Sequence, residues 1–221
     1  MKRFFSILLL LGVPMLMSAE NLIVSSPDGK LKVTLSDNGG KLSYAVMYKE
    51  YSIIESSPLG LVTNVGDYTK DAQFAKQETN YIDEHYTLNR IKKSDIHYVA
   101  NQLIATYNYP AHRVMQVVFN VSNNDIAFQY RLMPIGETVC AVVNSEATGF
   151  DFPAGTTTFL TPQSDPMIGW KRTKPSYEEE YVPDEPMGVP SKYGRGYTFP
   201  GLFHVGECWA LLSETGVTGE Y

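Results

Sequence analysis

The chain has 221 residues, of which 24 are acidic and 18 basic, and its formal net charge is −6. This charge argues against a nucleic-acid-binding protein, because binding to phosphate requires a basic face. The length is sufficient for one large hydrophobic core, and the 15 Tyr residues favour β-structure, since tyrosine packs well on half-buried strands.

Residues 1–19 are typical of a secretory signal peptide rather than of a folded segment. Two basic residues are followed by an almost wholly apolar run over residues 4–17, and the small residues Ser18 and Ala19 stand at the expected cleavage point. The run is too short to span a membrane. We therefore expect an exported protein, periplasmic or secreted, without a membrane span, whose folded domain covers residues 20–221.

Two β-hairpins are predicted by alternation of apolar and polar residues. The first covers residues 31–48, with its turn at Asp37-Asn38-Gly39-Gly40. The second joins residues 114–121 to residues 126–132 through a polar turn at residues 122–125. Since residues 114–121 are apolar on both faces, we expect this strand to lie in the centre of a sheet.

Shorter strands complete the predicted fold. Apolar residues nowhere recur at helical spacing over three turns, and many strands separated by regular turns indicate an all-β protein, a two-sheet antiparallel β-sandwich. These shorter strands are expected at Ser52–Ile54, Leu59–Thr63, Asp95–Tyr109, Thr138–Val143, Thr157–Leu160 and Leu202–Leu212.

Residues 161–200 are rich in Pro, Gly, Tyr and Glu and predict one long loop. Loops of that length inside a domain tend to be functional. Its acidic residues, Glu178, Glu179 and Glu180 among them, could supply oxygen ligands to calcium. On spacing alone a solvated acidic loop is favoured over a cation site, and the loop does not hold a complete calcium site.

Aromatic residues flank these acidic residues, with Trp170, Tyr177 and Tyr181 nearest to them. Aromatic faces next to charged groups suit carbohydrate recognition, because sugar C–H faces stack on rings while hydroxyls take polar partners. A loop held in place by its own tyrosines explains the same pattern equally well. The interpretations of this loop as a sugar-binding surface and as a structural feature stay open together.

No catalytic residue is assigned from sequence motifs. The chain has no Gly-x-Ser-x-Gly nucleophile motif and no phosphate loop. Its four His residues are scattered without a spacing that suits zinc. Cys140 and Cys208 make no disulfide framework, and two separate buried thiols are favoured over a bridge.

Five short segments carry a family resemblance that spans nearly all of the mature chain. Residues 25–33 (SSPDGKLKV), 44–48 (YAVMY) and 58–61 (PLGL) are followed by 123–130 (NNDIAFQY) and 211–221 (LLSETGVTGEY). In this order they resemble the N-terminal part of glycoside hydrolase family 97. Two departures lie in the fourth segment, where an Ile replaces the usual Gly and a Gln replaces the usual Arg.

The resemblance implies an exported, calcium-dependent α-glucosidase or α-galactosidase with three domains. An N-terminal β-sandwich of the galactose-mutarotase-like kind precedes a (β/α)8 barrel, which holds the catalytic carboxylates, and a small C-terminal β domain. The sandwich packs on the barrel and contributes one Glu to a calcium ion at the active site. Aligned by the Tyr that follows it, this ligand falls at Glu178, with Tyr181 as the anchor and Glu180 as the alternative register.

Three functional hypotheses follow from these observations. The first is an accessory domain that acts with a catalytic barrel of the same polypeptide on an α-linked oligosaccharide and is inactive alone. The second is a free-standing secreted carbohydrate-binding module, and the third is an exported interaction protein without a role in sugar binding. The sequence stops at Tyr221, one residue after a turn-rich segment, which favours the first hypothesis.

Overall fold

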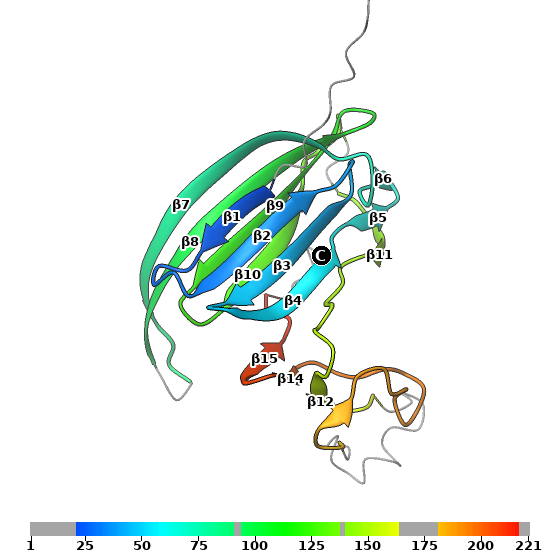
Figure 1. Ribbon diagram of the computed structural model, residues 1–221. Coiled ribbons are helices and arrows are strands. Elements are labelled where there is room, and N and C mark those ends of the chain that lie inside the picture. The colour runs from blue at the N-terminus through cyan, green and yellow to red at the C-terminus, as the bar shows by residue number, and fades with distance from the viewer. Residues whose placement is uncertain (1–20, 91–93, 138–139, 164–180, 217–221) are drawn as a thin grey trace, which may run out of the picture.

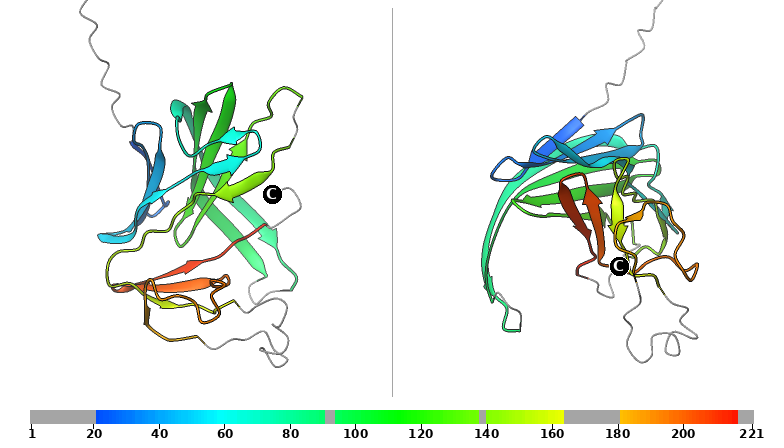
Figure 2. Two further views of the ribbon diagram at one scale, coloured as in Figure 1. Left: turned by 90° about the vertical axis from the view of Figure 1, so that its right-hand side faces the viewer. Right: turned by 60° about the horizontal axis from the view of Figure 1, so that its bottom comes forward.

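The computed structural model describes residues 21–90, 94–137, 140–163 and 181–216. Within these residues the chain forms four antiparallel sheets and no helix, so the all-β prediction is confirmed. Two large sheets face each other as separate layers, and a smaller sheet lies below them (Figures 1 and 2). A membrane-spanning helix is likewise absent from the described part of the chain.

The front sheet contains the first four strands in the order β1-β2-β3-β4. Its central hairpin pairs Leu31 with Tyr48 and Asp37 with Leu42, as the alternation predicts. The turn needs backbone that only glycine adopts without strain, and both Gly39 and Gly40 have positive φ angles. The strands are β1 (Asn21–Ser25), β2 (Leu31–Asp37), β3 (Leu42–Tyr48) and β4 (Tyr51–Pro58).

The back sheet has the order β10-β9-β8-β7. Its strands are β7 (Gln73–Thr87), β8 (Asp95–Tyr109), β9 (Arg113–Ser122) and β10 (Ile126–Leu132). The prediction that residues 114–121 form a central strand is confirmed, since β9 lies between two neighbours. Phe119 and Val118 point to opposite faces of this strand, and both are buried.

The core lies between these two sheets. Val33 and Leu35 of β2 and Val117 and Phe119 of β9 have no exposed surface. Phe119 packs against Tyr44 of the front sheet with ring centroids 5.9 Å apart. Burying apolar side chains from both layers supplies the main free energy that holds the sandwich together.

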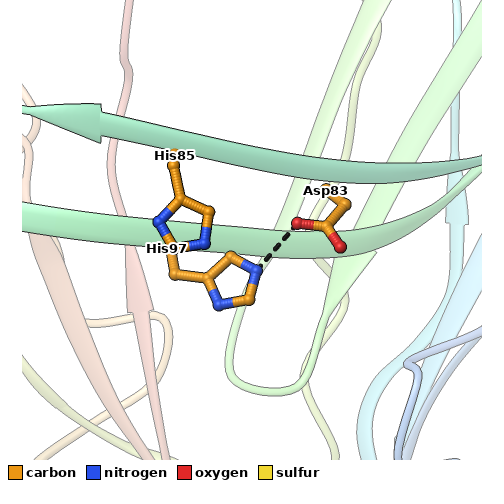
Figure 3. Close-up of side chains that lie close together, drawn as sticks. All are labelled: Asp83, His85 and His97. Carbon is orange, nitrogen blue, oxygen red and sulfur yellow. Dashed lines mark hydrogen bonds and ion pairs between the residues drawn. The ribbon is translucent and has the colours of Figure 1, made fainter.

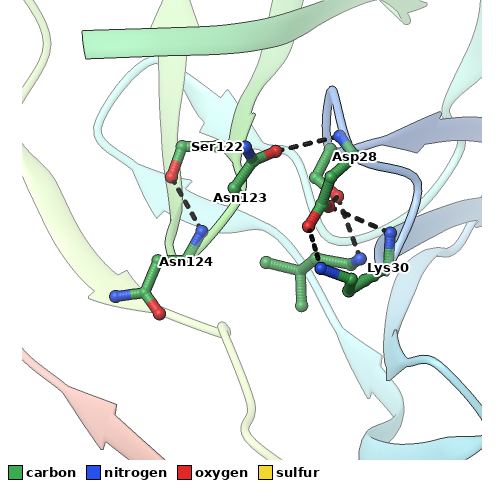
Figure 4. A network of polar contacts seen from close by, with 7 residues as sticks. Asp28, Lys30, Ser122, Asn123 and Asn124 are labelled. Atoms are coloured by element: carbon green, nitrogen blue, oxygen red, sulfur yellow. Dashed lines mark hydrogen bonds and ion pairs between the residues drawn. The ribbon is translucent and has the colours of Figure 1, made fainter. Parts of the chain in front are cut away.

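A polar network joins two turns at one end of the sandwich (Figure 4). The backbone N–H of Asp28, after β1, donates to the side-chain oxygen of Asn123, after β9, over 2.9 Å. The carboxylate of Asp28 pairs with Lys30 Nζ at 2.8 Å and accepts a hydrogen bond from Ser26 Oγ. These contacts, the Lys30 pairing first, lower the pKa of Asp28 to about 2.

Two smaller sheets complete the fold. The side sheet has the order β11-β5-β6, and the lower sheet has the order β13-β12-β14-β15. Phe203 of the lower sheet stacks on Phe152 with ring centroids 4.2 Å apart, and both belong to the same core cluster as the main sandwich. The strands are β5 (Leu61–Thr63), β6 (Gly66–Asp67), β11 (Val143–Glu146), β12 (Thr157–Phe159), β13 (Glu185–Pro186), β14 (Gly201–Val205) and β15 (Cys208–Leu212).

Some strand predictions need correction. The apolar stretch 202–212 is a hairpin of two strands, because a turn at Gly206 divides it. The strand expected at Thr138–Val143 begins only at Val143, where pairing with Thr63 of β5 starts. Strands β1, β7 and β13 were not predicted, and β13 interrupts the loop that was expected over residues 161–200. β7 lacked a signal because its residues are mostly polar and exposed on both faces. Cys140 and Cys208 are separate thiols, as favoured, but neither is buried as expected, since Cys140 is exposed and Cys208 half-buried.

Candidate functional site

The lower sheet holds both flanks of the segment that contains most of the predicted site residues. β12 leads into Gln163 on one side, and residues 181–184 lead into β13 on the other. β13 pairs antiparallel with β12. The chain therefore leaves β12 and enters β13 at the same end of the sheet. An isolated antiparallel β-bridge also pairs Pro162 with Tyr197, which brings the backbone before and after the loop together.

Four of the predicted site residues, Trp170, Tyr177, Glu178 and Glu180, lie outside the described residues. The fifth, Tyr181, is exposed, with 55% of its surface accessible to solvent. Next along the chain, Asp184 has a positive φ of 52° and its Oδ1 accepts a hydrogen bond from Thr157 Oγ1 over 2.9 Å. This contact anchors the return of the loop to β12.

An open cavity of about 410 Å³ lies against the inner face of the lower sheet. Its lining is mainly apolar and includes Phe152, Phe199 and Phe203, and its polar residues are Thr158, Glu185, Tyr197 and Thr198. Burial, followed by the charge of Glu185, raises the pKa of Tyr197. The phenol therefore stays protonated and donates to the carbonyl oxygen of Val189 over 3.1 Å.

The outer face of the lower sheet carries an exposed aromatic group, which we call the aromatic platform: Phe159, His204 and Trp209. The rings of His204 and Trp209 stack with centroids 4.2 Å apart and an angle of 6° between their planes. Trp209 also contacts Phe159, and 54% of its surface is exposed. His204 Nδ1 lies 3.6 Å from the Asp184 carboxylate, which links the platform to the base of the loop.

This arrangement offers two chemically different surfaces on one small sheet. The platform presents flat rings that can stack on the C–H face of a sugar or pack against another protein surface. The cavity presents apolar walls with one carboxylate, Glu185, among the described residues that line it. Glycosidic hydrolysis requires two carboxyl groups on either side of the scissile bond, and the described lining of this cavity does not provide such a pair.

Sequence reasoning missed the aromatic platform. Phe159 lies on β12, whereas His204 and Trp209 are cross-strand partners on β14 and β15. Treating residues 202–212 as one strand hid this pairing, although Gly206 was a usable turn signal between two apolar runs. With that turn recognised, a two-residue hairpin at Gly206-Glu207 would have placed His204 opposite Trp209.

The fold and this platform define an all-β domain with an exposed aromatic surface suited to contact with a sugar or a protein. Comparison with known families identifies the domain. The family model described as glycosyl hydrolase 97 N-terminal matches residues 24–221. The chain therefore belongs to glycoside hydrolase family 97, as the N-terminal domain. No curated protein matches the chain.

Solved structures agree with this assignment. A crystal structure of a β-arabinopyranosidase superposes with a TM-score of 0.83 and 47% sequence identity, covering 90% of this chain and 32% of that one. A family 97 enzyme from Pseudoalteromonas sp. strain K8, a variant in complex with panose, gives a TM-score of 0.69 at 19% identity over 84% of this chain and 27% of that one. The acarbose complex from the same strain gives 0.59 at 19% identity, over 64% and 22%.

These comparisons also show how much of each relative this chain covers and which fold they share. The chain spans about a third of the length of the β-arabinopyranosidase. The two Pseudoalteromonas structures share the fold of this domain at low sequence identity.

Proposed function

We propose that this chain is the N-terminal accessory domain of an exported glycosidase and packs on a catalytic barrel domain of the same polypeptide. The observation that carries the proposal is the 47% identity to a β-arabinopyranosidase, which covers nearly all of this chain but only 32% of the enzyme. A domain of this kind supports the reaction through its surface and its loops. Its export rests on the signal-peptide pattern of residues 1–19.

The loop on the lower sheet is the proposed route by which this domain reaches the active site. Calcium takes several oxygen ligands, and carboxylates are among the most common, so the donor set of this loop fits the ion chemically. Glu178 is the proposed ligand, with Glu180 as the alternative. When bound, the ion would supply a fixed positive charge that polarises and orients sugar hydroxyls. The described contacts of Asp184 anchor the C-terminal flank of this loop to the sheet.

The proposed substrate of the whole protein is a galactose-type glycoside, an α-galactoside or a β-L-arabinopyranoside within an α-linked oligosaccharide or related glycan. The structure at 47% identity is that of a β-arabinopyranosidase. The β-anomer of L-arabinopyranose has the ring stereochemistry of α-D-galactopyranose and lacks only its hydroxymethyl group. An α-glucoside differs from both at the axial hydroxyl, and the relatives solved with panose or acarbose share only 19% identity with this chain.

A domain exchange tests the proposal. Residues 20–221 would replace the N-terminal domain of the β-arabinopyranosidase, and hydrolysis of aryl glycosides would be measured with calcium and with a chelator. We expect calcium-dependent activity in the exchanged protein and none in this chain alone. Glu178→Gln should lower the activity at least about tenfold, because even partners outside a metal's coordination shell change affinity by about 10–100-fold. Glu179→Gln on the same loop is the matched control.

Three results would contradict this proposal. Turnover of an aryl α-galactoside, α-glucoside or β-L-arabinopyranoside by this chain alone would show that it carries its own catalytic residues. Unchanged calcium-dependent activity in both Glu178→Gln and Glu180→Gln would remove these residues from the metal site. An exchanged protein that is inactive although folded would contradict the accessory role.

A carbohydrate-binding module is the second candidate, and the exposed platform around Trp209 favours it. Stacking of a sugar on an exposed Trp is a common way to hold a glycan. In that case this chain alone would bind an oligosaccharide, and Trp209→Ala would abolish the binding. If the platform instead packs on the barrel, the isolated chain binds no glycan.

A further inference from the structure

We propose that Asp83, His85 and His97 form a binding site for a divalent transition metal, with Zn²⁺ as the best match, on the hairpin of β7 and β8. One ring nitrogen from each His and one carboxylate oxygen lie within 4.8 Å of one another. Figure 3 shows the two rings against each other with the Asp83 carboxylate beside them. The site lies on the back sheet and shares no strand with the lower sheet.

The strand register is what brings these three residues together. His85 and His97 are direct cross-strand partners, and Asp83 is opposite Val99. Residues two apart on a strand point to the same face, so Asp83 joins the two His side chains. The rings stack with centroids 3.9 Å apart, and His97 Nε2 lies 2.8 Å from Asp83 Oδ1. The sequence did not show the site because its ligands lie on either side of a turn.

The donor set selects the class of metal. Two imidazoles with one carboxylate are a common ligand set for zinc, and three protein ligands leave a coordination position for water. Zinc bonds of about 2.0–2.2 Å require ligand atoms roughly 3.3 Å apart in a tetrahedron. The three ligand atoms lie within 4.8 Å of one another, so the more distant ones must approach by up to about 1.5 Å, whereas His97 Nε2 and Asp83 Oδ1, 2.8 Å apart, must separate by about 0.5 Å. All three side chains are exposed, so their torsions can change without moving the core. The stacked rings must turn out of their parallel arrangement, because a metal lies in the plane of each imidazole that it bonds.

Binding replaces a hydrogen bond that the structure contains. The ring N–H of His97 donates to the Asp83 carboxylate. On binding through this nitrogen, the proton moves to the other ring nitrogen through solvent, and the freed lone pair bonds the metal. The imidazole stays neutral, and the carboxylate exchanges a hydrogen bond for a metal bond. This step needs no other reactant than the aquated ion.

The position of the site explains what the metal does for the fold. β9 pairs with β8 only from Ala100 to Tyr109, so residues 95–99 of β8 and their partners on β7 form a two-stranded ribbon. This ribbon bends away from the other strands (Figure 2, right). A two-stranded hairpin alone is only marginally stable. A metal that links His85 to His97 therefore holds the two strands of the ribbon together where β9 no longer pairs with β8.

Calorimetric titration of tag-free chain with ZnCl₂ tests the proposal. We expect one Zn²⁺ per chain, released by a chelator, and at least about a tenfold weaker affinity in His85→Gln, His97→Gln and Asp83→Asn. Matched controls are Glu84→Gln, whose side chain points to the opposite face of β7, and His112→Asn, in a distant turn with positive φ. Both controls should bind as the unchanged chain does.

Hydrogen exchange gives a second readout that separates a metal site from a stacked His pair. With zinc at 100 times its dissociation constant, exchange in residues 83–87 and 95–99 should slow by up to about 100-fold, since the ion binds only the closed ribbon. The proposal is overturned if the chain binds no zinc at micromolar concentration. It is equally overturned if binding is lost in Cys140→Ser and kept in His85→Gln, because the exposed thiol is then the ligand.

Discussion

Replacing Phe203 by Ala tests whether the lower sheet is packed into the same core as the sandwich. Phe203 is 8% exposed and stacks on Phe152, with 4.2 Å between ring centroids and 17° between ring planes. Truncating a buried Phe costs about 3–5 kcal/mol, of which the aromatic pair contributes about 0.5–1.5 kcal/mol. Because Phe203 borders the open cavity, water can fill part of the space left behind. We therefore expect the lower value, about 3 kcal/mol.

Urea unfolding followed by fluorescence and by circular dichroism measures this loss. In a Trp170→Phe background the remaining Trp209, on β15, reports on the lower sheet, whereas the dichroism reports on all sheets. The matched control is Leu211→Ala on the same hairpin, whose side chain is 63% exposed, with an expected change within about 0.5 kcal/mol. Phe203→Leu should cost less than about 1.5 kcal/mol, since it keeps most of the volume.

The reasoning is refuted if Phe203→Ala lowers the free energy of unfolding by less than about 1 kcal/mol, or by no more than Leu211→Ala. Such a result would mean that the lower sheet does not share the main core. Its loop would then lack the rigid base on which the proposed metal ligand depends, because a ligand must be held in place by packed elements.

Two further predictions concern the turns. Asp28→Asn should lower the melting temperature at neutral pH, because the Lys30 ion pair and hydrogen bonds hold the pKa of Asp28 at about 2, below its ordinary 3.8. The stabilisation by the Asp28 carboxylate is present above pH 3.8 and is lost as the pH falls through 2. The melting temperatures of the two proteins should therefore converge near pH 2. A constant difference down to pH 2 would contradict the stabilising role of the Asp28 charge. Gly60→Ala should destabilise by about 2–4 kcal/mol in urea titration, since φ is +150° and a Cβ would lie 2.9 Å from the backbone of Thr69. Gly206→Ala, where φ is +58° and the space is open, should cost only about 1–2 kcal/mol, and equal losses would disprove the steric argument.

Much of the fold could be predicted from the sequence, because a half-buried strand shows itself by alternation. Residues 31–48 and 126–132 alternate since one face of each strand meets the core, residues 114–121 are apolar on both faces because that strand is central, and the structure pairs these strands as expected. The family could also be inferred, since its motifs are local runs of residues. β7 gave no such signal: its residues are mostly exposed, and only its long pairing with β8 makes it a strand.

The candidate sites divide in the same way. The acidic loop is a local feature, but on spacing alone a solvated loop was favoured, and only the family resemblance singled out Glu178 as a calcium ligand, a prediction that lies outside the described residues. The pairs His204–Trp209 and His85–His97 are cross-strand contacts. Strand register determines which side chains meet, and register depends on turns and core packing that no single segment specifies. The sequence by itself therefore determined the all-β class and the family, whereas only the tertiary structure decided which rings and carboxylates lie side by side.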